Sequence, residues 1–216
     1  MFHDRQEAGQ KLAQALEKFK NAKEAIILAL PRGGVVVGFE IAKALNLPLD
    51  IVVPRKIGAP DNPEFAIGAI TESGEGIFDQ ETIAFYRISK EYIKKTVAEE
   101  KKEALRRLKL YRGDRPPLDL KDKTVILIDD GIATGATMRA AIKSVKEKGA
   151  KKVIVAVPVS APDSFKIIKR EVDEMISLAV PVFFGAVGAF YENFEQTSDE
   201  EVVDLMKKSE RFGEIK

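Results

Sequence analysis

The sequence contains no cysteine and no tryptophan, and it has a single histidine among its 216 residues. Without cysteine, the chain can form neither disulfides nor thiolate nucleophiles. The one histidine, His3, lies near the amino terminus, where we expect it to be solvated. We therefore expect neither a serine–histidine–aspartate arrangement nor a histidine-based metal cluster.

Long apolar runs and an imbalance of charge are also missing. The longest apolar run near the amino terminus covers residues 25–30, whereas a bilayer span needs roughly 20 apolar residues. There are 35 basic and 34 acidic residues, for a net charge of +1, which favours neither a nucleic-acid partner nor a membrane partner. We expect a cytoplasmic protein, and its 45% hydrophobic content suffices for a substantial core.

Short apolar segments alternate with helical patterns along most of the chain. This alternation predicts one α/β domain over residues 1–216, with a central, mostly parallel sheet flanked by helices. In such sheets, ligands bind beyond the carboxyl ends of the strands. The predicted strands cover residues 25–30, 49–53, 125–128, 153–157 and 175–178; the predicted helices cover 5–19, 35–45, 89–110, 137–148 and 162–170, with a last helix opened by Ser198; a hairpin is expected at 65–70 and 76–78, a loop at 54–63, and irregular chain at 181–197.

The most informative segment joins an acidic pair to the start of a helix. Asp129 and Asp130 follow four apolar residues, and a loop with Thr134, Gly135 and Thr137 leads into the next helix. A helix amino terminus offers unpaired N–H groups and partial positive charge to an anion. The carboxylates would repel a phosphate and should face sugar hydroxyls or a hydrated metal ion. A sugar phosphate satisfies both halves.

The same segment could also be a turn with no ligand. In that case Asp-Asp-Gly would only reverse the chain, and Thr137 would serve only as a helix N-cap. The full run of strand, acidic pair, small-residue loop and helix favours a binding site over a plain turn. Neither a P-loop motif nor a dinucleotide-binding glycine fingerprint is present in the sequence.

Two further loops carry groups suited to anions. Arg32, Gly33 and Gly34 follow the first predicted strand, and they offer a forked donor and accessible backbone N–H groups. Arg55 and Lys56 follow the second strand. Taken alone, the first loop could be an ordinary turn and the second a solvated loop end. Their position at strand ends beside the acidic pair favours an anion-binding function.

The run from residue 126 to residue 137 resembles the phosphoribosyl-pyrophosphate (PRPP) binding motif of type I phosphoribosyltransferases. The resemblance implies the fold of that family, with a small hood subdomain built from the chain ends. It also implies that Asp129 and Asp130 contact the ribose hydroxyls. The following residues would bind the 5-phosphate: Gly131, Ile132, Ala133, Thr134, Gly135, Ala136 and Thr137. Gly131 departs from the larger apolar residue often found there.

The resemblance also assigns the leaving-group side of the site. Arg32, Gly33, Gly34, Arg55 and Lys56 would bind pyrophosphate, and the bond between Pro31 and Arg32 is expected to be cis. By the same resemblance Arg32, Lys56 and Arg112 are the catalytic residues, and Arg112 contacts the β-phosphate. Magnesium (Mg²⁺) would be bound through PRPP, with Asp129 and Asp130 reaching it only through water and no direct protein ligand.

The acceptor side is less well defined by the sequence. The resemblance implies a core at about residues 25–180, a hood from 1–24 and about 179–216, and a flexible-loop insertion at about 71–117. Phe184, Phe190 and Tyr191 are the candidate acceptor residues, although aromatic residues at such positions are more often hood core. Ala133 stands where members acting on 6-oxopurines commonly carry aspartate, which disfavours a hypoxanthine or guanine acceptor.

The predicted activity is transfer of the 5-phosphoribosyl group from PRPP to a nitrogen nucleophile, a nucleobase or an amine, with release of pyrophosphate. This would place the protein in nucleotide metabolism, as a homodimer. The alternative is a non-catalytic regulator that senses PRPP or nucleotides on the same fold. The basic groups Arg32, Arg55 and Lys56 favour catalysis, because a sensor of ribose phosphate could dispense with them.

Overall fold

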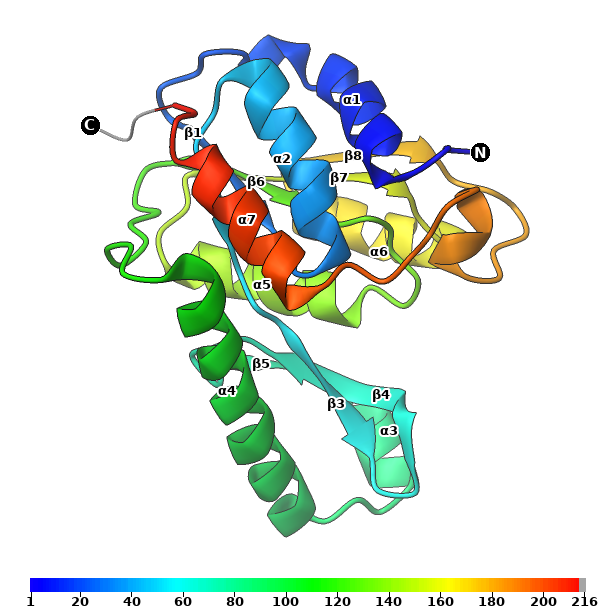
Figure 1. Cartoon of the computed structure of the whole chain (residues 1–216). Coiled ribbons are helices and arrows are strands. Elements are labelled where there is room, and N and C mark those ends of the chain that lie inside the picture. The colour runs from blue at the N-terminus through cyan, green and yellow to red at the C-terminus, as the bar shows by residue number, and fades with distance from the viewer. Residues whose placement is uncertain (214–216) are drawn as a thin grey trace.

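The body of the protein is built on a five-stranded parallel sheet in the order β2-β1-β6-β7-β8. The computed structural model describes residues 1–213, apart from the side chain at position 64. The predicted α/β class is confirmed, since the central sheet is parallel and flanked by helices (Figure 1). The strands are β1 (Ala25–Ala29), β2 (Leu49–Ile51), β6 (Thr124–Ile128), β7 (Lys152–Val159) and β8 (Glu174–Ala179).

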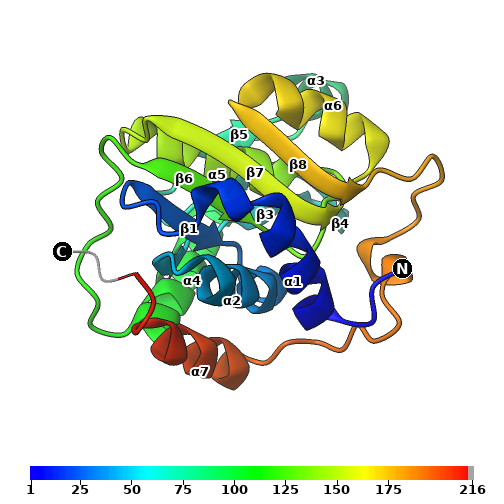
Figure 2. The same ribbon diagram turned by 90° about the horizontal axis from the view of Figure 1, so that it is seen from above.

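Helices cover both faces of this sheet. Figures 1 and 2 show α1, α2 and α7 on one face and α5 and α6 on the other. Both faces of the central strands are therefore apolar, which explains why these strands are continuous hydrophobic runs in the sequence. The helices of the body are α1 (Arg5–Ala15), α2 (Gly33–Leu45), α5 (Ala136–Glu147), α6 (Pro162–Glu171) and α7 (Asp199–Ser209), with a short 3₁₀ helix η1 (Glu17–Phe19) after α1.

Alternate side chains of β6 enter two different cores. Ile126 and Ile128 pack with α1, α2 and α7, whereas Val125 and Leu127 pack with α5. All four side chains are fully buried. Because each such side chain contributes roughly 1.5–3 kcal/mol on burial, the two cores hold β6 firmly in place. The segment that follows β6 therefore starts from a fixed point.

Residues 55–112 form a separate layer that projects from the body, here called the arm (Figure 1). An antiparallel sheet of three strands, in the order β3-β4-β5, packs on α5 and α4. Its own small core contains Ile57, Ile67 and Ile70. The elements are β3 (Arg55–Ala59), β4 (Asn62–Ile70), β5 (Gly76–Phe78), α3 (Gln80–Phe85) and α4 (Lys90–Arg112).

The prediction of a loop over residues 54–63 is wrong, because β3 and the start of β4 occupy this stretch. Glycine and proline in the segment indicated a loop, but pairing with β4 supplies the hydrogen bonds that the local sequence does not reveal. A β-bulge at Gly58 accommodates the tight turn, where a Cβ atom would lie 2.4 Å from the Pro63 carbonyl oxygen. The predicted hairpin of β4 and β5 is confirmed.

The amino terminus packs beside the segment that follows β8. Phe2 forms a β-bridge with Tyr191, and its amide donates to the Phe190 carbonyl oxygen at 2.8 Å. Residues 181–197 are irregular, as predicted, except for the 3₁₀ helix η2 (Val187–Phe190). Residues 214–216 of the predicted hood lie outside the described residues. Within residues 1–213, no helix combines the length and the apolar character that crossing a membrane requires.

Candidate functional site

The loops after β1 and β6 touch at the carboxyl edge of the sheet. The Leu30 amide donates to the Ile128 carbonyl oxygen at 2.9 Å, which extends the pairing of the strands into the loops. A Cβ atom on Gly33 would lie 2.0 Å from Asp130 Oδ2, and one on Gly34 would lie 3.0 Å from Asp129 Cα. Only glycine permits this approach, so the structure brings the predicted anion loop and the acidic pair together.

The acidic pair is partly buried and carries perturbed pKa values. Burial raises the pKa of Asp129 well above its usual value, and the nearby charge of Asp130 raises it further. Burial also raises the pKa of Asp130, although the adjacent Arg5 guanidinium opposes this shift. Asp129 Oδ1 accepts from the Asp130 amide at 2.8 Å. Both side chains lie just beyond the end of β6 and stay partly exposed, so a ligand with hydroxyl groups can reach them.

Arg5 is a residue of this site that the sequence interpretation missed. Its Nε donates to Asp130 Oδ2 at 2.7 Å, and its Nη1 donates to the Glu195 carbonyl oxygen at 2.7 Å. The guanidinium carbon lies 3.8 Å from the centroid of the Phe194 ring. Because Arg5 lies 125 positions from Asp130 in the chain, no local motif could have indicated the contact.

The loop between Asp130 and α5 is anchored at its first half and open at its second. The Ile132 amide donates to the Val159 carbonyl oxygen at 2.9 Å, and Ser164 Oγ donates to the Ala133 carbonyl oxygen at 2.5 Å. Within residues 1–213, the amides of residues 133–137 find no hydrogen-bond acceptor. Gly135 has a φ of +77° and precedes the first turn of α5. This loop can therefore donate backbone N–H groups to an anion.

Gly131 is explained by a neighbour from the carboxyl-terminal segment. A Cβ atom at Gly131 would lie 2.5 Å from Val187 Cγ1 and 3.0 Å from Val159 Cγ1. These two valines fill the volume that a larger side chain at position 131 would need. The packing of η2 against the loop therefore fills the space that a larger apolar side chain at position 131 would occupy.

Arg32 lies at the start of α2, after a cis peptide bond to Pro31, which confirms the predicted isomer. Its Nη1 lies 3.4 Å from Oδ1 of Asp199, the first residue of α7. The Tyr111 hydroxyl donates to the same oxygen at 2.6 Å. These two donors, the tyrosine more strongly, lower the pKa of Asp199. Asp199 and Tyr111 are further neighbours of the site that the sequence interpretation missed.

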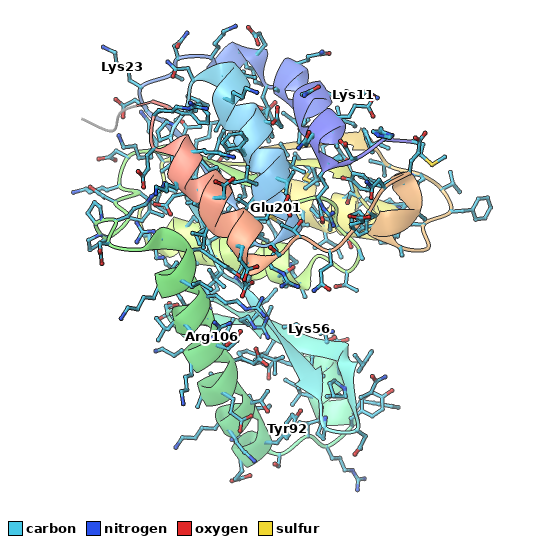
Figure 3. The ribbon with its side chains drawn as sticks, viewed as in Figure 1. Lys11, Lys23, Lys56, Tyr92, Arg106 and Glu201 are labelled. Carbon is cyan, nitrogen blue, oxygen red and sulfur yellow. The ribbon has the colours of Figure 1, made fainter. Side chains whose placement is uncertain are left out.

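Arg55 and Lys56 belong to the arm, because both lie on β3. Arg55 Nε donates to Glu100 Oε2 of α4 at 2.6 Å. Figure 3 shows Lys56 toward the end of the arm that adjoins the body, and Tyr92 toward the far end. The pair therefore follows β2 as predicted, but on a strand that leads away from the central sheet.

Arg112 is engaged by Asp50 of β2. Its Nε and Nη2 donate to the two carboxylate oxygens of Asp50 at 2.8 and 3.0 Å, and Nη2 also donates to the Pro116 carbonyl oxygen at 2.6 Å. The Arg112 and Asp50 side chains are only 12% and 9% exposed. This bidentate, nearly buried ion pair joins α4 to β2 and does not support the predicted contact with a β-phosphate.

The predicted acceptor residues separate into two groups. Phe184 lines an open cavity of about 600 Å³ next to Ala133, and Phe190 stacks on Phe184 with ring centroids 5.5 Å apart. Tyr191 is buried against Phe2, and its hydroxyl donates to the Asp130 carbonyl oxygen at 2.6 Å. The remaining lining of the cavity comes from α6, its preceding loop and the chain after β8: Ala161, Pro162, Asp163, Ser164, Val180 and Val182.

Within the part of the chain that the structure describes, no group of three or more histidine, cysteine, aspartate or glutamate side chains converges as a metal site. Asp129 and Asp130 are two adjacent carboxylates, and Asp199 is engaged with Arg32 and Tyr111. A divalent cation at the site would therefore need most of its ligands from a bound molecule and water.

Comparisons with known proteins agree with this geometry. The sequence matches the phosphoribosyl transferase domain family over residues 2–192. A protein of Mycobacterium tuberculosis named as a candidate phosphoribosyl transferase is 40% identical over 211 residues, which cover 98% of this chain and 47% of that protein. The chain thus spans about half the length of this curated relative.

Two other matches differ in extent. The crystal structure of TT1426 from Thermus thermophilus is 40% identical, has a TM-score of 0.81, and the match covers 96% of this chain and 98% of that one. A uracil phosphoribosyltransferase of Bifidobacterium longum is 36% identical over only 70 residues, which are 32% of this chain and 33% of that enzyme.

Proposed function

The chain belongs to the phosphoribosyl transferase domain family, and from this premise we propose that it binds PRPP and transfers the 5-phosphoribosyl group to a nitrogen nucleophile. The membership confirms the resemblance predicted from residues 126–137. The acceptor is a nucleobase or an amine in this proposal, and pyrophosphate is released.

One observation carries the proposal: two complementary chemistries adjoin at the carboxyl edge of the sheet. Asp129 and Asp130 offer carboxylates to the ribose hydroxyls. The amides of residues 133–137, which find no acceptor among the described residues, offer donors to the 5-phosphate. The loop at Gly33 and Gly34 touches the acidic pair. A pyrophosphate bonded to C1 of the same ribose would then be within reach of that loop.

In the proposed reaction, the bond between ribose C1 and the pyrophosphate oxygen breaks, and its electron pair leaves with the pyrophosphate. A lone pair on the acceptor nitrogen forms the new bond to C1. Positive charge develops on the ribose ring and negative charge on the leaving group. Arg32 and the amides beside Gly33 and Gly34 stabilise the leaving group, while the acidic pair holds the ribose in orientation.

Arg55 and Lys56, which belong to the arm, also bind pyrophosphate in this proposal. Both lie on β3, immediately after the chain leaves β2. Arg55 is paired with Glu100, so a bound pyrophosphate would share its charge with that carboxylate. Arg112 is left out of the proposed machinery, because its Nε and Nη2 both donate to the Asp50 carboxylate.

Magnesium fits the donor set as an ion that PRPP itself would bring. The carboxylates of Asp129 and Asp130 are suitable oxygen groups, reached through water, but no third acidic side chain among residues 1–213 converges with them. When bound, the metal supplies neutralisation of the diphosphate charge. All other contacts that orient PRPP are assigned in this proposal to the loops of this chain.

The acceptor is proposed to bind in the cavity beside Ala133. Val180, Val182 and Phe184 contribute apolar lining, and Phe184 offers a ring face for stacking. Ala133 has no group that moves a proton, so the proposal disfavours a 6-oxopurine acceptor. The short match to uracil phosphoribosyltransferases covers about a third of the chain, which is too little to assign uracil.

The proposal is tested by following pyrophosphate release from magnesium–PRPP across a panel of nucleobases and amines. We expect turnover with one acceptor class. The Asp129→Asn/Asp130→Asn double variant serves as the inactive control. Tight PRPP binding without turnover across the whole panel would contradict the transferase activity and favour a PRPP-sensing regulator. Absence of PRPP binding would contradict both functions.

A further inference from the structure

Arg5 connects the amino-terminal helix to the acidic pair. Its Nε lies 2.7 Å from Asp130 Oδ2, and its side chain is only 11% exposed. Within residues 1–213, Arg5 is the one cationic side chain that forms an ion pair with either aspartate. A cation in this place determines which oxygens of Asp130 stay available to a ligand.

The Arg5 guanidinium is fixed from three directions. Nη1 donates to the Glu195 carbonyl oxygen at 2.7 Å, and the group stacks on the Phe194 ring at 3.8 Å. A Cβ atom on Gly33 would lie 2.7 Å from Arg5 Nε, so the guanidinium also lies against the loop after β1. An arginine side chain that is already held by a hydrogen bond, an aromatic ring and a neighbouring backbone loses little further conformational entropy when a ligand binds.

Asp130 is fixed by the same set of residues. Its carboxylate is held by Arg5 through Oδ2, and its carbonyl oxygen accepts from the Tyr191 hydroxyl at 2.6 Å. A carboxylate has about four lone-pair sites, so a bond from Arg5 to Oδ2 leaves capacity on the carboxylate to accept from a ligand hydroxyl. The orientation of Asp130 therefore depends on residues from both ends of the chain.

We propose that Arg5 is a positioning residue that holds Asp130 in the orientation that receives a ribose hydroxyl, and that it thereby sets the preference of the site for a ribose phosphate over a phosphate without a diol. This inference rests on the proposed function. Arg5 acts on ligand selection through Asp130, while the 5-phosphate is bound independently by residues 133–137.

A purely structural role for Arg5 makes a different prediction. If Arg5 only tied the chain ends to the sheet, its loss would lower stability and would weaken every ligand of the site to a similar degree. A positioning role instead predicts different effects on the two halves of the ligand, the diol and the phosphate. Loss of Arg5 should weaken recognition of the diol and leave recognition of the phosphate unchanged.

The experiment is calorimetric titration with two probes, ribose 5-phosphate and inorganic phosphate. In the Arg5→Gln variant we expect the ratio of the two affinities to fall by about tenfold or more, because a charged hydrogen bond no longer orients Asp130. The affinity for inorganic phosphate should stay within about twofold of the wild type. Arg5→Lys retains the charge and is expected to restore part of the preference.

Controls keep the test decisive. Lys11→Gln removes an exposed ion pair with Glu7 on the same helix, and it should leave the ratio unchanged. If Arg5→Gln does not fold, Phe194→Leu removes the ring under the guanidinium and should lower the ratio about threefold. An unchanged ratio in the folded variants would overturn the role of Arg5. A wild type without preference for ribose 5-phosphate would contradict the proposed function itself, and with it this role.

Discussion

At the scale of single residues, glycines let neighbouring segments approach closely and so determine which side chains the site brings together. Glycines 33, 34 and 131 lie where a Cβ atom would meet Asp130, Asp129 and Val187 respectively. The first two bring the anion loop against the acidic pair. Gly131 lets Val187 of η2 pack directly on the proposed phosphate-binding loop, and this packing stabilises the loop.

Gly131→Ala should destabilise the protein by about 1–3 kcal/mol through overpacking, because its Cβ atom would lie 2.5 Å from Val187 Cγ1. Val187→Ala in the same chain should recover part of this loss. Urea denaturation of both single variants and the double variant measures the coupling. Gly185→Ala is the matched control, since no atom lies within 4 Å of its added Cβ. Strictly additive effects at positions 131 and 187 would contradict the packing argument.

Some of the site could be predicted from the sequence because its parts are contiguous. Asp129, Asp130 and the loop to Thr137 link a buried strand to a helix start, and each of these features has a local signature. Arg5 and Asp199 could not be predicted in the same way. Their positions follow from tertiary packing, which joins segments more than 100 residues apart.

At the scale of elements, α4 joins the arm to the body through Arg112 and Asp50. Removing one partner of a nearly buried ion pair leaves the other charge uncompensated and typically costs about 3–5 kcal/mol. Arg112→Ala should therefore lower the free energy of unfolding by this amount, as measured by urea denaturation. Arg112→Met combined with Asp50→Leu should recover most of the loss. A small effect of Arg112→Ala on stability, together with loss of PRPP binding, would restore Arg112 to the ligand site.

The middle of α4 gives a pH-dependent prediction. Hydrogen bonds from Arg106 and Arg107 lower the pKa of Glu103 from 4.5 to about 2. The contribution of Glu103 is therefore fully present above pH 4.5 and is lost as the pH falls toward 2. Glu103→Gln should lower stability at neutral pH by about 0.5–1 kcal/mol, and the difference should shrink below pH 4.5.

Urea denaturation between pH 7 and pH 3 measures this difference, with Glu99→Gln as a control. Glu99 pairs only loosely with Lys95, at 4.0 Å and with both side chains mostly exposed, so its variant should show little change with pH. A Glu103→Gln effect that stays constant across the range would contradict the assigned ion pairs.

Predictability also varied among the elements. The helix starts at Ser89 and Ser198 were predicted correctly, because each serine accepts a hydrogen bond from the amide three residues later. Strand β3 was missed because its pairing with β4 is a property of two segments and not of one. The strands of the central sheet were easier to predict, since burial on both faces makes them uniformly apolar.

At the scale of the whole molecule, the two sheets differ in how deeply they are buried. The central sheet lies between two large cores, whereas the fully or nearly fully buried side chains of the arm core are Ile57, Ala59, Ile67 and Ile70. Native-state hydrogen exchange should show the strongest amide protection in β1, β6 and β7 and lower protection in β4 and β5. Equal protection in both sheets would contradict the inference that the smaller core makes the arm less stable than the central sheet.

Residues from the amino-terminal and carboxyl-terminal segments complete the proposed donor site from outside the central sheet. Arg5 contacts Asp130, Val187 fills the space beside Gly131, and Asp199 receives Arg32. Sequence patterns predicted the donor half of the proposed site, because one continuous segment carries its central chemistry. The supporting residues depend on the fold as a whole, and only the structure reveals them.

PRPP binding by the acidic pair is the central property proposed for this site. Calorimetric titration of magnesium–PRPP into the wild type and the Asp129→Asn/Asp130→Asn variant tests it. We expect tight binding by the wild type and a loss of about 3 kcal/mol in the variant, because charged hydrogen bonds to the ribose hydroxyls are weakened. Thermal unfolding of the variant verifies that it is folded. Equal affinity of the two folded proteins would contradict the assignment of the diol to Asp129 and Asp130.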